Sequence, residues 1–170
     1  MKGIHRTLGA VFMAVMIGSA ATTAFPEDAD PAIRKKHFLL KDNKLAIQGY
    51  DPVSYFQMKP GVGRPDFSHT HLGVTYYFKN AGNLAAFRKA PGKYEPAYGG
   101  WCAYAMADGG KTKVNPMTYK IVDGRLFLFY DGLFGNTLKK WNERSGTQGG
   151  DNVQIESADR HWKQFLGKNG

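Results

Sequence analysis

The fold class is indicated most clearly by residues 119–130, which read YKIVDGRLFLFY. Two runs of apolar and aromatic residues flank the dipeptide Asp123-Gly124. Asp-Gly favours the type I′ hairpin turn, because both central residues of that turn need a positive φ. The stretch therefore predicts an antiparallel β-hairpin with strands over 119–122 and 125–130.

A second hairpin is predicted upstream, over residues 67–78. Phe67-Ser68-His69-Thr70-His71 and the run 74–78 contain β-branched and aromatic residues, and Leu72-Gly73 separates them. Such residues favour strands, and glycine supplies the backbone conformation that a tight turn needs. Residues 45–48 are a further candidate strand.

Short helices are predicted around these hairpins. Asp51 and Asn80 are good N-cap residues for helices over 52–56 and 81–89, and Pro52 suits a first helical position. Further helices are predicted over 101–107, after Gly99-Gly100, and over 138–141. A C-terminal helix docking on the sheet is marked by apolar residues at helical spacing, namely Ile155, Ala158, Trp162 and Phe165.

The loops complete the predicted architecture. Glycine and proline mark loops over 59–65 and 145–150, and Pro91-Gly92 is expected to stop the preceding helix. No internal repeat is visible. The sequence therefore predicts an α+β fold, in which a small antiparallel sheet built from β-hairpins is covered by short helices in a single domain.

The first 24 residues have the pattern of a secretory signal peptide, with a basic head, an apolar stretch over 8–17 and a tail of small residues. The apolar stretch is shorter than the roughly 20 residues that span a bilayer. We expect cleavage after Ala24, then an N-terminal arm over 25–44, a domain over 45–166 and a tail over 167–170. The expected location is periplasmic or secreted, with no transmembrane segment after leader cleavage.

Charge and cysteine usage limit the function classes. The formal net charge is +9, and it falls to +7 when the leader takes Lys2 and Arg6 away. The basic residues are scattered and are not interleaved with base-stacking aromatics, so no nucleic-acid partner is expected. The single cysteine, Cys102, excludes a disulfide within the chain. A basic surface suits anionic membrane surfaces, polyanions or acidic partners such as an envelope protein, and the alternative is a basic surface that is simply solvated.

Several segments resemble the YHS domain family, in its exported, stand-alone branch. They are Gly49-Tyr50-Asp51-Pro52-Val53-Ser54-Tyr55-Phe56, Phe67-Ser68-His69, Tyr76-Tyr77-Phe78, Tyr98-Gly99-Gly100-Trp101-Cys102-Ala103-Tyr104 and Ala158-Asp159-Arg160-His161-Trp162. The resemblance implies an association with metal transport or metal sensing. Metal-associated relatives carry three cysteines at the positions that are here Ser54, Lys79 and Asn83. Their thiolate site is therefore not carried over, and any metal must use other residues.

Cys102 is the first candidate ligand. We expect it in the opening turn of a helix, where the helix dipole lowers a thiol pKa. Met106 lies four residues on, on the same helical face, and a thiolate with a thioether suits Cu(I). The alternative is that both side chains pack into the core, as free cysteine and methionine usually do.

His69 and His71 are the second candidate pair. Residues two apart on a strand project from the same face, so these imidazoles could share one copper or zinc ion. Phe67 shares that face, and the alternative is one half-buried and one solvated histidine.

Tyrosines form a third group, which either lines an aromatic ligand pocket or packs in the core with each hydroxyl finding a partner. They are Tyr50, Tyr55, Tyr76, Tyr77, Tyr94, Tyr98 and Tyr104.

The sequence supports three hypotheses for function. The first is a non-catalytic protein that binds a transition metal through Cys102, His69, His71 or Met106. The second is a metal-free module for a small molecule or an envelope protein, with Cys102 buried and the histidines apart from it. The third is a thiol-dependent redox protein, which needs an exposed Cys102. No nucleophile elbow, phosphate loop or histidine-glutamate zinc motif indicates an enzyme.

Overall fold

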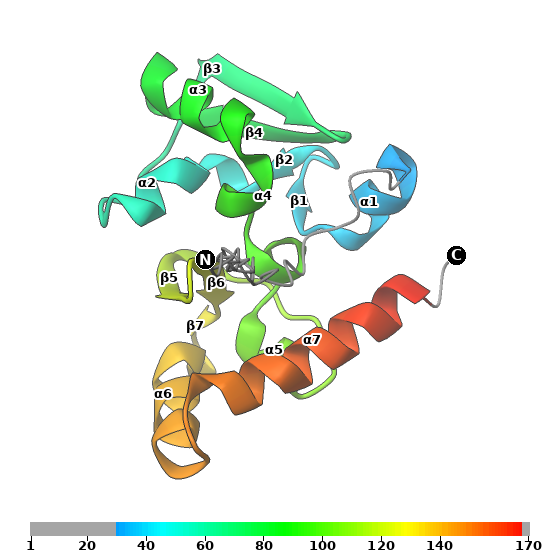
Figure 1. The fold of residues 1–170 in the computed structure, drawn as a ribbon, viewed down its shortest axis with the longest axis vertical. Helices are drawn as coiled ribbons and strands as arrows, with labels where there is room; N and C mark the ends of the chain where they lie inside the picture. The colour runs from blue at the N-terminus through cyan, green and yellow to red at the C-terminus, as the bar shows by residue number, and fades with distance from the viewer. Residues whose placement is uncertain (1–29, 168–170) are drawn as a thin grey trace, which may run out of the picture.

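A computed structural model describes residues 30–167 of the chain. The predicted leader, the first part of the predicted arm and the last three residues lie outside this range. Within it, the elements run in the order shown by Figure 1 and form the α+β fold that the sequence predicts.

The hairpin around Asp123-Gly124 is confirmed. Strands β5 (Asn115–Val122) and β6 (Arg125–Phe129) pair antiparallel, and Val122 faces Arg125 across the turn. Asp123 has a φ of 49° and Gly124 a φ of 74°, as a type I′ turn requires. Residues 126–129 of β6 are all buried, so this strand runs through the core.

A four-stranded sheet contains the second predicted hairpin. Its strands are β1 (Leu40–Lys41), β2 (Leu45–Ala46), β3 (Arg64–His71) and β4 (Val74–Phe78), in the order β1-β2-β4-β3. The β3–β4 hairpin is antiparallel as predicted, but β2 pairs with β4 in parallel, so the sheet is mixed. The long connection from β2 to β4 allows a parallel pair, which a short hairpin turn does not.

The remaining elements cover these strands. A small hairpin consists of β7 (Asp131–Gly132) and β8 (Gly135–Asn136). The helices and 3-10 turns are α1 (Pro31–His37), η1 (Ile47–Gly49), α2 (Pro52–Phe56), α3 (Ala81–Lys89), α4 (Pro91–Tyr94), η2 (Ala97–Gly100), α5 (Ala103–Ala107), α6 (Thr137–Thr147) and α7 (Asp151–Gly167).

Both predicted N-caps are confirmed, and some boundaries are corrected. The Asp51 side chain accepts from the Val53 amide, and the Asn80 side chain accepts from the Asn83 amide. Helix α3 ends at Lys89, before Pro91-Gly92, as predicted, and Pro91 then begins the unpredicted α4, because proline suits a first helical position. Strand β2 stops at residue 46, directly before η1, and α6 continues to residue 147 into the predicted loop.

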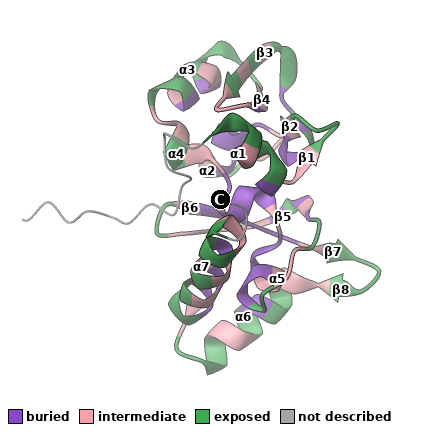
Figure 2. Ribbon diagram, turned by 90° about the vertical axis from the view of Figure 1, so that its right-hand side faces the viewer, coloured by how far each residue is buried: buried purple, intermediate pink, exposed green. Residues whose placement is uncertain are grey.

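The molecule has two halves that share one core. Figure 1 shows the N-terminal half (31–100), with the four-stranded sheet and α1–α4, above the C-terminal half (101–167), with β5–β8 and α5–α7. Buried residues are concentrated where the halves meet (Figure 2). Tyr98, at this junction, packs its ring 5.8 Å from that of Phe127 and 6.2 Å from that of Trp162. Between residues 30 and 167, no helix has both the length and the apolar character to cross a membrane.

Candidate functional site

Cys102 lies in the core. Its side chain is fully buried, and its Sγ lies 3.4 Å from Thr137 Oγ1. The predicted helix over 101–107 begins only at Ala103, because Cys102 is extended and forms a backbone bridge with Leu128 of β6. Met106 is equally buried. The expectation of a thiol in the opening helical turn is therefore corrected, and the packed-core alternative describes both side chains.

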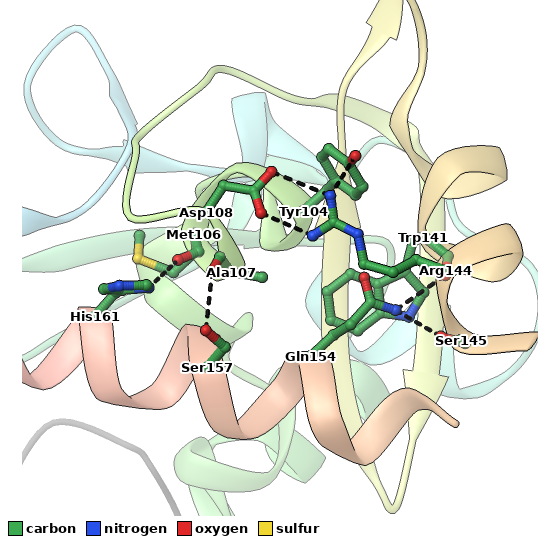
Figure 3. A network of polar contacts seen from close by, with 10 residues as sticks. All are labelled: Tyr104, Met106, Ala107, Asp108, Trp141, Arg144, Ser145, Gln154, Ser157 and His161. Carbon is green, nitrogen blue, oxygen red and sulfur yellow. Dashed lines mark hydrogen bonds and ion pairs between the residues drawn. The ribbon is translucent and has the colours of Figure 1, made fainter. Parts of the chain in front are cut away.

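Helix α5, which carries Met106, is held by polar contacts from α6 and from α7 (Figure 3). From α6, Arg144 Nη1 donates to Asp108 Oδ1 at 2.7 Å. From α7, Ser157 Oγ donates to the Ala107 carbonyl at 3.0 Å, and His161 Nδ1 lies 3.1 Å from the Met106 carbonyl oxygen. These contacts assign α5 and its buried side chains to structural packing.

His69 and His71 share one face of β3 with Phe67, as predicted, and all three are half-buried. The two imidazole rings are 6.5 Å apart between centroids, with planes inclined by 25°. Each ring also packs 6.2 Å from the ring of Phe87. Burial lowers the pKa of His69, and the charges of Arg88 and His71 lower it further. His69 therefore favours the neutral imidazole.

The candidate metal ligands do not form one site. Strand β3 lies in the N-terminal half of the molecule and helix α5 in the C-terminal half (Figure 1). His69 and His71 are thus separated from Cys102 and Met106. Across the described range of 30–167, no three His, Cys, Asp or Glu side chains are grouped as metal ligands.

A buried carboxylate occupies the place where the resemblance puts thiolates. Asp51 is fully buried; its Oδ1 accepts from the Val53 amide at 2.9 Å, and its Oδ2 accepts from the Lys79 amide at 2.9 Å and from Asn83 Nδ2 at 2.6 Å. Ser54 Oγ donates to the Asp51 carbonyl at 2.7 Å. We name these residues the Asp51 cluster.

The Asp51 cluster does not fit a metal ion. Its hydrogen-bond donors point at the carboxylate, and soft-metal binding needs deprotonated thiolates instead. The cluster ties α2, β4 and α3 together. Sequence reasoning assigned Asp51 to helix capping alone, and the two further donors could not be found without knowing that β4 and α3 approach it.

Three of the seven tyrosines pack in the core rather than around a ligand pocket. Tyr55, Tyr76 and Tyr98 are almost completely buried, and burial raises the pKa of each hydroxyl. These hydroxyls donate to Pro116 O at 3.0 Å, to Glu95 Oε1 at 2.7 Å and to Asp159 Oδ1 at 2.9 Å. Core packing with a partner for each hydroxyl, which is the second alternative, therefore describes these three tyrosines.

A pocket of about 310 Å³ lies where the two halves meet. Segment 39–41, including β1, forms one wall and η1 another, while the end of η2 and the segment before β5 close the opposite side. Its lining is mostly apolar, with polar side chains added by two lysines and a glutamine. The lining residues are Leu39, Leu40, Lys41, Ile47, Gln48, Gly100, Lys113 and Val114.

The backbone of one pocket wall is strained. Ile47 has a φ of 49° and Gln48 a φ of 54°. Positive φ is rare for a β-branched residue and costs about 1–3 kcal/mol. Gln48 Nε2 donates to the Val114 carbonyl at 3.2 Å and so holds this wall against the opposite one. Strain of this kind is concentrated at binding sites, where the surroundings fix a shape that the chain would not adopt alone.

The charge of the pocket is positive. Lys41 and Lys113 are exposed, and neither takes part in an ion pair with any residue between 30 and 167. An apolar pocket with two unpaired ammonium groups is complementary to a small apolar molecule that bears an acidic group.

Sequence reasoning did not find this pocket. Its residues come from the predicted arm, from the end of a predicted strand and from a segment to which no element was assigned. None belongs to a motif with known chemistry. The one available signal was Leu39-Leu40, an apolar pair between the lysine-rich end of α1 and Lys41.

Comparison with known proteins gives no relative on which to base a function. No family model matches the chain, and no curated protein and no solved structure matches it.

Proposed function

We propose that this chain is an exported, non-catalytic binding module that holds a small apolar molecule with an acidic group in the pocket between its two halves. The observation that carries the proposal is the apolar pocket with Lys41 and Lys113 unpaired beside it. Pockets between structural units are common ligand sites. The leader pattern and the resemblance to exported YHS proteins support the location, and the ligand class is inferred from the pocket alone.

The placement of Cys102 favours this proposal over the thiol-dependent hypotheses. A redox thiol and a surface soft-metal site both require an accessible sulfur. Cys102 is fully buried, and the histidine pair is carried by β3, in the other half of the molecule. These are the two features that the metal-free hypothesis requires.

A pocket-filling variant tests the proposal. Leu40 is half-buried in the lining, so Leu40→Trp adds a large ring to the cavity. The probe is anilinonaphthalene sulfonate, an apolar anion that fluoresces when it leaves water, titrated into wild type and variant. We expect saturable binding by wild type and at least tenfold weaker binding by Leu40→Trp.

The control is Val153→Trp, at an exposed apolar residue of α7 away from the pocket lining. It should bind the probe as wild type does, and thermal unfolding should show that both variants are folded. Equal binding by wild type and a folded Leu40→Trp would contradict the proposal.

A second candidate function, metal binding, is favoured by one observation. His69 and His71 present two half-buried imidazoles on one strand face, with ring centroids 6.5 Å apart. Two histidines can supply half of a tetrahedral zinc site, and solvent or a partner would supply the rest.

Competition titration with Zn(II) and Cu(I) tests this function. Under this hypothesis, binding is lost in His69→Ala/His71→Ala and kept in Cys102→Ala. Loss in Cys102→Ala alone would place the site in the core instead, and no binding by wild type would exclude the metal hypothesis.

A further inference from the structure

The β7–β8 hairpin exposes two large apolar side chains at its tip. Leu133 is 99% exposed and Phe134 is 84% exposed, more than any other large hydrophobic residue between 30 and 167. Figure 2 shows the hairpin projecting from the body of the molecule. Exposed apolar side chains on a projecting element are unfavourable in water and mark an interaction site when they are held in place.

The tip is held in place from beneath by Tyr130. The Phe134 amide donates to the Tyr130 hydroxyl at 3.2 Å, and the two rings stack with centroids 6.5 Å apart. A Cβ on Gly132 would lie 2.6 Å from that hydroxyl oxygen, so any larger residue there would require the Tyr130 ring to move. These contacts fix the conformation of the tip, so that Leu133 and Phe134 are held exposed to solvent.

The residues of this region contradict the local rules for stability. Turns favour glycine, asparagine and aspartate, whereas this turn has Leu133-Phe134 at its centre. The first turn of a helix favours acids, whereas the first turn of α6 contains Lys139 and Lys140 and no acid. Lys140 Cε lies 3.9 Å from the position of a Cβ on Gly135, so this lysine lies along the hairpin.

We propose that the β7–β8 hairpin docks the protein on an anionic lipid surface. Leu133 and Phe134 enter the boundary between headgroups and acyl chains, while Lys139 and Lys140 contact headgroup phosphates behind them. Apolar insertion combined with basic residues is the chemistry of reversible membrane binding. The hairpin's acid, Asp131, lies at its base, where Thr118 Oγ1 donates to it at 3.4 Å.

A lipid surface fits this tip better than a protein partner does. Two projecting side chains cover far less than the roughly 800 Å² that each partner buries in a stable protein interface. Insertion into a bilayer needs no such area, because each apolar side chain gains separately by leaving water. The net charge, +9 for the full sequence and +7 without Lys2 and Arg6 of the predicted leader, adds long-range attraction to anionic lipid. This site is independent of the pocket.

Vesicle flotation tests the proposal. The full chain is expressed, and the exported protein is purified after any cleavage of the leader. Mass spectrometry determines its N-terminus. Vesicles contain phosphatidylcholine alone or equal parts of phosphatidylcholine and phosphatidylglycerol. We expect wild type to float with the mixed vesicles, and Leu133→Ser/Phe134→Ser to bind at least about tenfold more weakly.

Two further variants separate the apolar and charged contributions. Lys139→Gln/Lys140→Gln should weaken binding to mixed vesicles by roughly tenfold or more and leave binding to phosphatidylcholine unchanged. Met58→Ser/Val62→Ser removes two other exposed apolar side chains and should bind as wild type does. All changed side chains are exposed, and thermal unfolding checks that each variant is folded.

Three results would overturn the proposal. The first is absence of wild-type flotation with mixed vesicles. The second is an equal loss of vesicle binding in Met58→Ser/Val62→Ser, which would show nonspecific hydrophobic adsorption. The third is self-association that is lost in Leu133→Ser/Phe134→Ser without any vesicle binding, which would assign the tip to a contact between copies.

Discussion

The Asp51 cluster and the pocket differ in how their polar groups are satisfied. Each carboxylate oxygen of Asp51 accepts at least one hydrogen bond inside the protein, and the residue is shut off from solvent. Lys41 and Lys113, beside the pocket, are exposed and have no ion-pair partner among residues 30–167. A closed, satisfied cluster stabilises a fold, whereas an open site with unpaired charge is able to bind a ligand.

The family resemblance directs attention to the segment around Asp51, whereas the structure makes this segment a structural cluster and places the candidate binding site elsewhere. The most recognisable motif, around Asp51-Pro52-Val53-Ser54, forms the closed cluster. The candidate binding site is built from residues that belong to no motif, apart from Gly100. Substitutions in the cluster should therefore change stability, and substitutions at the pocket should change binding.

The largest expected effect is that of Asp51→Ala. It leaves the Lys79 amide and the Asn83 side chain without their buried acceptor, which should lower the free energy of unfolding by about 3 kcal/mol or more. Urea denaturation measures this. The control is Asp66→Ala, because Asp66 and its partner Arg64 are mostly exposed; it should cost no more than about 1 kcal/mol. Equal costs in the two variants would contradict the assignment of Asp51 to a structural cluster.

Cys102→Ala should have an intermediate effect. Removing the buried sulfur leaves a small cavity between α5 and Thr137, which should cost about 1–2 kcal/mol. The wild-type thiol should react with Ellman's reagent only after denaturation. Rapid reaction of the folded protein would show that the sulfur is accessible and would restore the thiol-dependent hypotheses.

The smallest expected effect is a pH dependence from His69. Its folded-state pKa is lowered, first by burial and then by Arg88 and His71. The unfolded chain therefore binds more protons than the folded one as the pH falls below about 6.5, and stability is lost through that window.

Unfolding by urea between neutral pH and pH 5 measures this slope. His69→Gln should flatten it, and it should do so more than Lys163→Gln, a change at an exposed residue of α7. An unchanged slope in His69→Gln would show that this imidazole does not titrate differently on folding.

The fold was predictable where local signals and burial agree. Asp123-Gly124 fixes one hairpin through its positive φ angles, and Asp51 and Asn80 fix two helix starts. The parallel pairing of β2 with β4 was not predictable, because it joins segments far apart in the chain. The start of α5 was also missed, since the bridge of Cys102 to β6 overrides local helical propensity.

The candidate site was predictable only in part. The shared face of His69 and His71 follows from strand periodicity. The pocket depends on how two halves of the chain meet, and no residue spacing records that. Positive φ at Ile47 is a tertiary constraint, and isoleucine itself gives no sign of it.

Selection of an apolar ligand with an acidic group is the property that the pocket should show. Its most direct test compares decanoate with decanol as competitors for anilinonaphthalene sulfonate, on wild type and on Lys41→Gln/Lys113→Gln. We predict that decanoate binds wild type more tightly than decanol by roughly tenfold, as two exposed ion pairs of up to about 1 kcal/mol each would give. The lysine variant should lose this preference while keeping its stability. Equal binding of the two competitors by wild type would contradict the claim.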